Sequence, residues 1–115
     1  MKDLTFKFHL ADSSYMTALR LVAGAVCSAH DIDVDASEDF KVCITESAII
    51  LKDSGFESVS IVFGGEDKLV CTVTGEGGVP HESENEFSLA LISALVEDCS
   101  IDRRGGAIER VILKI

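Results

Sequence analysis

Two hairpin patterns most constrain how this chain can fold. Apolar residues recur at every second position over residues 59–63 and again over 69–73, and "GGED" (64–67) between them is typical of a hairpin turn. Closer to the end of the sequence, "CSIDR" and "AIERVILKI" flank the turn "RGG" (104–106) in the same way. Because a hairpin joins antiparallel strands, the sequence predicts a sheet that is mostly antiparallel.

Three other segments have the periodicity of helices. Apolar residues at helical spacing form one stripe over residues 13–30 and another over 35–55. "FSLALISALV" (87–96) is apolar on nearly every side, so we expect this third helix to be deeply packed. Residues 4–10 alternate apolar and polar side chains instead, which predicts a half-buried strand.

Each expected helix is preceded by residues that are typical of an N-cap. Asp12 or Ser13 would cap the first helix. "DASE" (35–38) and "SENE" (83–86) both have the capping-box arrangement, in which an acidic side chain follows the capping residue at the third helical position. We therefore expect the second helix to begin just after Asp35.

The order of these elements is strand, helix, helix, hairpin, irregular segment, helix, hairpin. Helices and antiparallel strands are thus segregated along the chain, which is typical of an α+β fold. We expect a two-layer sandwich in which helices cover one face of a mostly antiparallel sheet. The 115 residues suffice for one hydrophobic core, and no linker or repeat divides them, so residues 1–115 are expected to form a single domain.

The formal net charge of -10, from 20 acidic and 10 basic side chains, restricts the partners of this chain. Such a field repels nucleic acid and anionic lipid and favours a basic partner surface, although acidity also serves solubility alone. The longest apolar run, around 89–96, is too short to cross a bilayer, and residues 1–10 lack the pattern of a signal peptide. We therefore expect a cytoplasmic protein with no membrane and no nucleic-acid partner.

The cysteines do not indicate a metal site or a disulfide framework. Each of the four lies inside an expected helix or strand, at positions 27, 43, 71 and 99. None forms a C-x-x-C pair, and no histidine stands at metal-ligand spacing. Small buried thiols in a reducing compartment fit this distribution best.

Four segments match a known set of motifs in order and spacing. "LRLVAGAVCSAHDID" contains Arg20, "CITESAIILKDSG" contains Glu46, "VTGEGGV" is a glycine-rich turn, and "EFSLALISALVEDCSI" is a helix followed by a strand. Together they resemble the histidine-kinase-like ATPase superfamily, and most closely its small anti-sigma-factor serine kinases of bacterial partner-switching systems. The resemblance covers essentially the whole chain and implies the histidine-kinase-like ATPase fold, with Arg20 in the place of the family's usual arginine.

In that family these motifs form a nucleotide site. A helix glutamate orients the attacking group, an asparagine four residues later holds magnesium, and an aspartate in the glycine-rich turn accepts a hydrogen bond from adenine. The resemblance implies that Glu46 is the glutamate, a candidate relic base, and that Ile50 takes the asparagine position. The turn aspartate falls on Gly75, its first glycine is kept as Gly77, and the opening glycine of the last motif falls near Ser88 or Glu86.

These departures remove the groups that a nucleotide needs. Magnesium requires oxygen ligands, the Ile50 side chain supplies none, and Asp53 lies almost a turn further along the helix. Gly75 offers adenine no acceptor, and a polar base edge buried without its partner costs roughly 1–3 kcal/mol. No lysine or arginine occurs between Lys68 and Arg103, so phosphates would meet acidic side chains without a cation.

Three hypotheses follow from these patterns. The leading one is a degenerate, pseudokinase-like regulatory protein that binds a sigma factor or an antagonist-like protein, in which ATP binding is weak or absent. Arg20 then contacts the partner, or forms only a local salt bridge, and Glu46 is a relic. The alternative is an active ATP-dependent serine protein kinase and anti-sigma factor, with ATP and magnesium as cofactors and Glu46 as its base. The third is a structural or homodimerising subunit, or a protein that binds another small molecule in an apolar pocket lined by Ile50.

Overall fold

Five strands and three helices follow one another in the predicted order within residues 3–115, the part of the chain that the computed structural model describes. The elements are β1 (Leu4–His9), α1 (Ser14–Ala29), α2 (Val34–Asp53), β2 (Ser58–Gly64), β3 (Val70–Glu76), α3 (Glu86–Leu95), β4 (Asp98–Arg104) and β5 (Ala107–Lys114). No helix in this part of the chain is long and apolar enough to span a bilayer.

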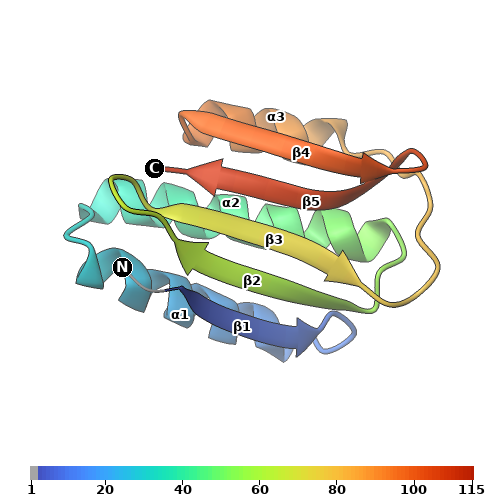
Figure 1. Ribbon diagram of the computed structural model, residues 1–115, viewed down its shortest axis with the longest axis horizontal. Helices are drawn as coiled ribbons and strands as arrows, with labels where there is room; N and C mark the ends of the chain where they lie inside the picture. Colours follow the sequence, from blue (N-terminus) through green and yellow to red (C-terminus); the bar gives the residue numbers. More distant parts are fainter. Residues whose placement is uncertain (1–2) are drawn as a thin grey trace.

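The strands form one five-stranded sheet in the order β1-β2-β3-β5-β4, and every neighbouring pair is antiparallel. The helices lie together on one face of this sheet, so the molecule has two layers (Figure 1). The predicted α+β sandwich with an antiparallel sheet is therefore confirmed. β3 pairs with β5 from Val70 to Thr74 but with β2 as far as Glu76. The last two residues of β3 consequently pair with β2 alone.

The core lies between the sheet and the helices α1 and α2. Inward side chains of β2, among them Ile61 and Phe63, are fully buried, and so is the predicted stripe of α2. That stripe comprises Phe40, Cys43, Ile44, Ser47, Ala48 and Leu51. The one hydroxyl group in this stripe, that of Ser47, donates a hydrogen bond to the carbonyl of Cys43 at 2.7 Å, so it is not left unpaired in the core. The central helix is thus held by apolar burial on the face that the periodicity predicts.

The expectation that the third helix is deeply packed is wrong. Within α3 the only buried residue is Ile92, while Phe87 is 79% exposed. The physical reason is the position of the helix, which lies beside α2 and over β4, the last strand of the sheet (Figure 1). At this edge the remaining side of the helix has no further element of the fold to pack against.

The second helix begins two residues earlier than the capping-box pattern predicts. Its N-cap is Asp33, which has an extended backbone (φ -65°, ψ 163°) and accepts a hydrogen bond from the amide of Ala36 at 2.8 Å. Asp35 instead lies in the first turn of α2, where its charge favours the positive end of the helix dipole. The expected start after Asp35 is therefore wrong, because the side chain of Asp33 already caps a free amide of the first helical turn, that of Ala36.

The other two predicted caps differ in their bonding. Ser13 is the N-cap of α1 but makes no capping bond, and Asp12 accepts from the amide of Ser14 at 3.0 Å instead. The N-cap of α3 is Asn85, not Ser83, because the Ser83 hydroxyl donates to the side chain of Asn85 at 3.1 Å. The predicted capping box before α3 is therefore absent.

Replacing Asp33 by alanine should lower the free energy of unfolding by about 1 kcal/mol, because the amide of Ala36 then loses its acceptor. Asp35→Ala removes only a charge from the first helical turn and should cost about 0.3 kcal/mol. Urea denaturation of the two variants and the parent protein measures this difference. A larger loss for Asp35→Ala than for Asp33→Ala would place the start of α2 at residue 36.

Candidate functional site

The structure brings Glu46 and Ser88 together, although they are 42 positions apart in the sequence. Glu46 lies midway along α2 and is partly buried, and Ser88 lies in the first turn of α3. The Ser88 hydroxyl donates a hydrogen bond to Oε2 of Glu46 at 2.8 Å. The two predicted site residues therefore form one pair that joins two helices, and the carboxylate keeps its second oxygen for another contact.

Ile50 and Asp53 do not form a site. The side chain of Ile50 is 1% exposed and belongs to the hydrophobic core, whereas Asp53 is exposed at the end of α2. A ligand cannot reach Ile50 without opening the core. This burial counts against an apolar small-molecule pocket lined by Ile50, and Asp53 alone would supply only one carboxylate to a metal ion.

Gly75 has no room for a side chain. A Cβ atom at this position would lie 2.5 Å from Cγ of Phe56, whose ring covers the glycine and is itself buried. An aspartate here would have to displace that ring. The position that lacks the adenine acceptor therefore also lacks space for one, because an aromatic ring occupies the space that a carboxylate would need. The sequence alone did not indicate this.

The glycine-rich turn after β3 lies against the end of α2. A Cβ on Gly78 would be 2.2 Å from the carbonyl oxygen of Gly55, and a Cβ on Gly55 would be 2.4 Å from that of Val79. Both glycines also have positive φ angles, of 71° and 92°. Gly77, with φ 70°, lies beside the side chain of Glu57. The glycines of this turn thus permit backbone-to-backbone contact within the protein.

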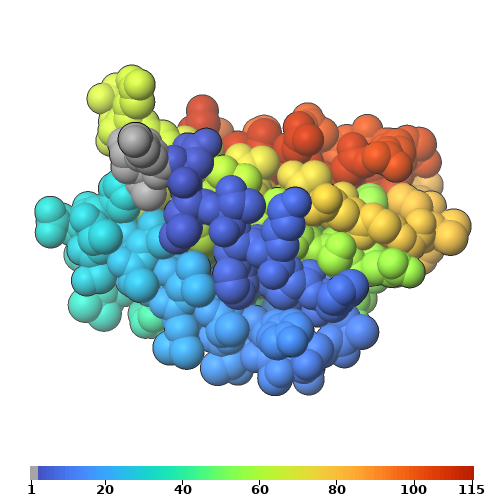
Figure 2. All heavy atoms as spheres, turned by 60° about the horizontal axis from the view of Figure 1, so that its bottom comes forward, coloured from blue at the N-terminus to red at the C-terminus, as the bar shows by residue number. Residues whose placement is uncertain are grey.

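Hydrogen bonds fix the segment that follows the turn. The amide of His81 donates to the carbonyl of Ser54 at 2.8 Å, and the hydroxyls of Ser54 and Ser83 are 3.1 Å apart. Ser54 is buried, and its hydroxyl also donates to the carbonyl of Ile50 at 2.8 Å. In the space-filling view this gold segment lies against the green residues after α2 and the orange β4–β5 hairpin (Figure 2). These hydrogen bonds hold the segment against the end of α2.

Two arginines of the C-terminal hairpin lie near the glycine turn. Arg104 and Arg110 line a hollow of about 410 Å³ together with residues 75–78. The expectation that a phosphate would find no cation here is therefore wrong, because the pairing of β3 with β5 brings in cations from a distant part of the sequence. Both arginines already have partners, since Arg104 pairs with Glu109 and Nη1 of Arg110 is 3.4 Å from Oδ2 of Asp102.

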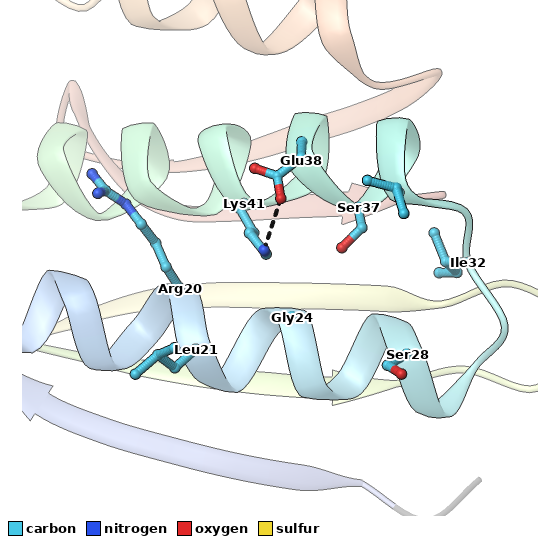
Figure 3. Close-up of a pocket in the computed structure, with 9 residues that line it drawn as sticks. Arg20, Leu21, Gly24, Ser28, Ile32, Ser37, Glu38 and Lys41 are labelled. Atoms are coloured by element: carbon cyan, nitrogen blue, oxygen red, sulfur yellow. Dashed lines mark hydrogen bonds and ion pairs between the residues drawn. The ribbon is translucent and has the colours of Figure 1, made fainter.

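An open groove runs between α1 and α2, on the side of the helices away from the sheet (Figure 3). Its volume is about 400 Å³. Gly24 leaves room for Lys41, whose Nζ pairs with Oε1 of Glu38 at 3.0 Å. Leu21 and Val34 on its walls are 72% and 75% exposed. The groove therefore combines apolar side chains with an ion pair that water can reach.

Arg20 connects this groove to Glu46. A second hollow of about 360 Å³ shares Arg20, Glu38 and Lys41 with the first and extends to Glu46. Nε of Arg20 donates to the hydroxyl of Thr45 at 3.4 Å. Among residues 3–115, the ion pairs do not include Arg20, so the local salt bridge is not formed. Its guanidinium group retains free donors that face an open hollow.

The thiols have no suitable environment for nucleophilic or metal chemistry. All four are free cysteines: Cys27, Cys43, Cys71 and Cys99. Burial raises the pKa of each thiol, and that of Cys43 reaches about 12. Because the thiolate is the reactive form, such thiols are inert near neutral pH. Within residues 3–115, no group of three or more histidine, cysteine, aspartate or glutamate side chains could hold a metal ion.

Comparison with known proteins does not assign this chain. Its sequence matches no family model, and none of the curated proteins is significantly similar to it. The resemblance to histidine-kinase-like ATPases therefore stays a prediction from the motifs. What the protein does has to be argued from the geometry of its own side chains.

Gly75→Ala should lower the free energy of unfolding by about 1–3 kcal/mol, because the added methyl group meets the ring of Phe56. Combining it with Phe56→Leu should recover part of this loss, which thermal or urea denaturation of the single and double variants measures. Gly24→Ala is the matched control, because its methyl group would meet only the flexible end of Lys41 and alanine favours a helix. Parental stability of Gly75→Ala would contradict the packing described for Phe56.

Proposed function

We propose that this protein is a regulatory protein-binding module of the anti-sigma-factor type, in which nucleotide binding is weak or absent. The observation that carries this proposal is the packing at the end of α2, where the glycine turn contacts Gly55 and the ring of Phe56 covers Gly75. At Ile50 and Gly75, two positions that the resemblance assigns to a nucleotide, contacts within the protein occupy the space that its ligands would need. A bound nucleotide would have to break them.

The cost of opening this end supports the proposal. Moving the segment after β3 would break the bond between His81 and Ser54 and the contact between the hydroxyls of Ser54 and Ser83. Each such bond contributes about 0.5–1.5 kcal/mol, and the buried hydroxyl of Ser54 would lose a partner. Phosphates would in addition compete with the carboxylates that already pair with Arg104 and Arg110. Nucleotide binding would therefore be weakened by two effects: the loss of these hydrogen bonds, and competition between phosphates and carboxylates for the two arginines.

The groove between α1 and α2 supports a protein as the ligand. It presents the free donors of Arg20 beside exposed Leu21 and Val34, and arginine flanked by apolar side chains is typical of the energetic centre of interfaces. A partner that fits this groove offers a carboxylate to Arg20 and apolar side chains to its walls. A sigma factor or an antagonist-like protein is the partner that the resemblance implies.

A second candidate function is the active serine protein kinase. It is favoured by the pair of Glu46 and Ser88, because a carboxylate that lines an open hollow is accessible to a hydroxyl group. In that case Arg20 and Lys41 would be the nearby cations for a phosphate. The two functions differ in their need for ATP, which gives a direct test.

Calorimetric titration with Mg·ATP and Mg·ADP should give no saturable heat at nucleotide concentrations up to about 1 mM. A Kd of about 1 mM corresponds to a binding free energy of about -4 kcal/mol. The physical reason is that a nucleotide would have to break the contacts at the end of α2. Micromolar, magnesium-dependent binding would support the kinase instead. Glu46→Gln then serves as the matched variant, because a kinase that uses this carboxylate as its base would still bind ATP but would lose phosphate transfer to an antagonist protein.

Arg20→Ala should weaken binding to a purified sigma factor of the same organism by at least about 10-fold, equivalent to 1.4 kcal/mol. Removing the guanidinium group takes away the charged donors of the groove. Arg103→Ala is the matched control, since Arg103 is an exposed arginine on β4 whose side chain donates to the carbonyl of Gly106. Biosensor measurements on the three proteins give the ratio, and equal losses for both variants would argue against a role of the groove.

A further inference from the structure

The solvent-facing side of α3 carries an apolar stripe. Phe87, Ala90, Leu91 and Ala94 follow the spacing i, i+3, i+4, i+7, so they lie along one face of the helix. Phe87 is 79% exposed, Ala90 and Ala94 are exposed, and Leu91 is partly buried. The opposite side is the one that holds the helix in the fold, through buried Ile92. Most of the stripe is therefore left uncovered by residues 3–115.

The composition of the stripe suits a second helix. A single exposed apolar residue is ordinary on a protein surface, but a run at this spacing is the pattern by which a helix binds another helix or a groove. The two alanines, both C-terminal to the exposed anchor Phe87, allow a close approach of backbones along the rest of the stripe. At ten residues α3 is about 15 Å long, which matches about three turns of a partner helix.

Charge restricts what can cover the stripe. Residues 69–102 contain no lysine or arginine, and exposed carboxylates stand at both ends of α3. Glu84 and Glu86 lie at its N-terminal end, and Glu97 and Asp98 follow its C-terminal end; Lys114 is 4.0 Å from Asp98. A second copy of this chain would bring the same carboxylates and a net charge of -10 against them. An anionic membrane would be repelled for the same reason.

We propose that this stripe docks an amphipathic helix of a partner protein, whose apolar face is bordered by lysine or arginine. Phe87 is the anchor that inserts into the apolar face of the partner helix, and the carboxylates at the two ends of α3 pair with its basic residues. The surface is separate from the groove between α1 and α2. The inference goes beyond the proposed function, because it needs neither Arg20 nor a sigma factor.

The apolar part of this proposal is tested with a synthetic helix of about 18 residues, five turns, that has leucine on one face and lysine on the other. A scrambled peptide of the same composition carries the same charge without an apolar face. Fluorescence anisotropy should show at least 10-fold weaker binding of the scrambled peptide and, for the amphipathic one, of the variant Phe87→Ser. Leu4→Ser is the matched control, since Leu4 is an exposed apolar residue on β1, at the other edge of the sheet from α3, and should bind like the parent protein.

The charged part is tested by neutralising the ends of the stripe. Glu84→Gln combined with Glu97→Gln should weaken peptide binding and reduce its dependence on salt. Glu66→Gln combined with Asp67→Asn removes two exposed carboxylates from the turn between β2 and β3 and should leave binding unchanged. Amide chemical shifts of the parent protein should change along α3 when the peptide is added.

Three results would overturn the inference. Equal binding of the scrambled peptide would mean that only the net charge is recognised, and equal binding by Phe87→Ser would mean that the stripe is not the site. A dimer in sedimentation experiments that dissociates in Phe87→Ser would mean that a second copy covers the stripe. Arg20→Ala should leave peptide binding unchanged, so failure of this inference is distinguishable from failure of the proposed function.

Discussion

The contact between two backbone segments at the end of α2 is the constraint on which this end of the molecule depends. Gly55 and Gly78 both have positive φ angles, and neither tolerates a Cβ atom because a carbonyl oxygen lies in its place. This contact sets the path of the chain from β3 to α3. It also places Ser54 where it can bond the segment, and Phe56 where it covers Gly75. The glycine-rich turn is therefore explained by packing within the protein, with no phosphate required.

The helical layer presents two surfaces of different chemistry. Between α1 and α2 lie the free donors of Arg20 and the side chain of Lys41, in a molecule that is otherwise strongly acidic. On α3 an apolar stripe lies between carboxylates. The first surface favours an acidic group of a partner and the second a basic one. A regulatory protein with two such surfaces can engage two different partners, or two parts of one partner, without the surfaces competing.

Much of the fold could be predicted because its signals are local. The alternation over residues 59–63 and 69–73 identifies one hairpin, and the helical stripe of α2 identifies the face that is buried. The packing of α3 could not be predicted, because it depends on the place of that helix at the edge of the sheet. The start of α2 was misplaced by two residues because Asp33 and Asp35 are both good capping residues.

The candidate site was predictable only in part. The motif resemblance indicated Glu46 and Ser88, which the structure joins by a hydrogen bond, but no pattern in the sequence placed Phe56 over Gly75. The cations beside the glycine turn were missed for the same reason: Arg110 reaches Thr74 across 36 positions, through strand pairing that periodicity does not encode. Contacts between distant segments, rather than local propensity, decide what this end of the protein can bind.

The limited burial of α3 should make this helix less stable against local opening than the rest of the molecule. With one fully buried side chain, and with Leu89 and Leu95 only partly buried against the core, this helix has less apolar burial than α2, so we expect it to open locally before the sheet does. Its amides should then exchange with solvent through such openings, well before the whole chain unfolds. A partner bound to the solvent-facing side of α3 would suppress those openings. Because Ser88 of α3 bonds Glu46, the surroundings of Glu46 would then become more rigid.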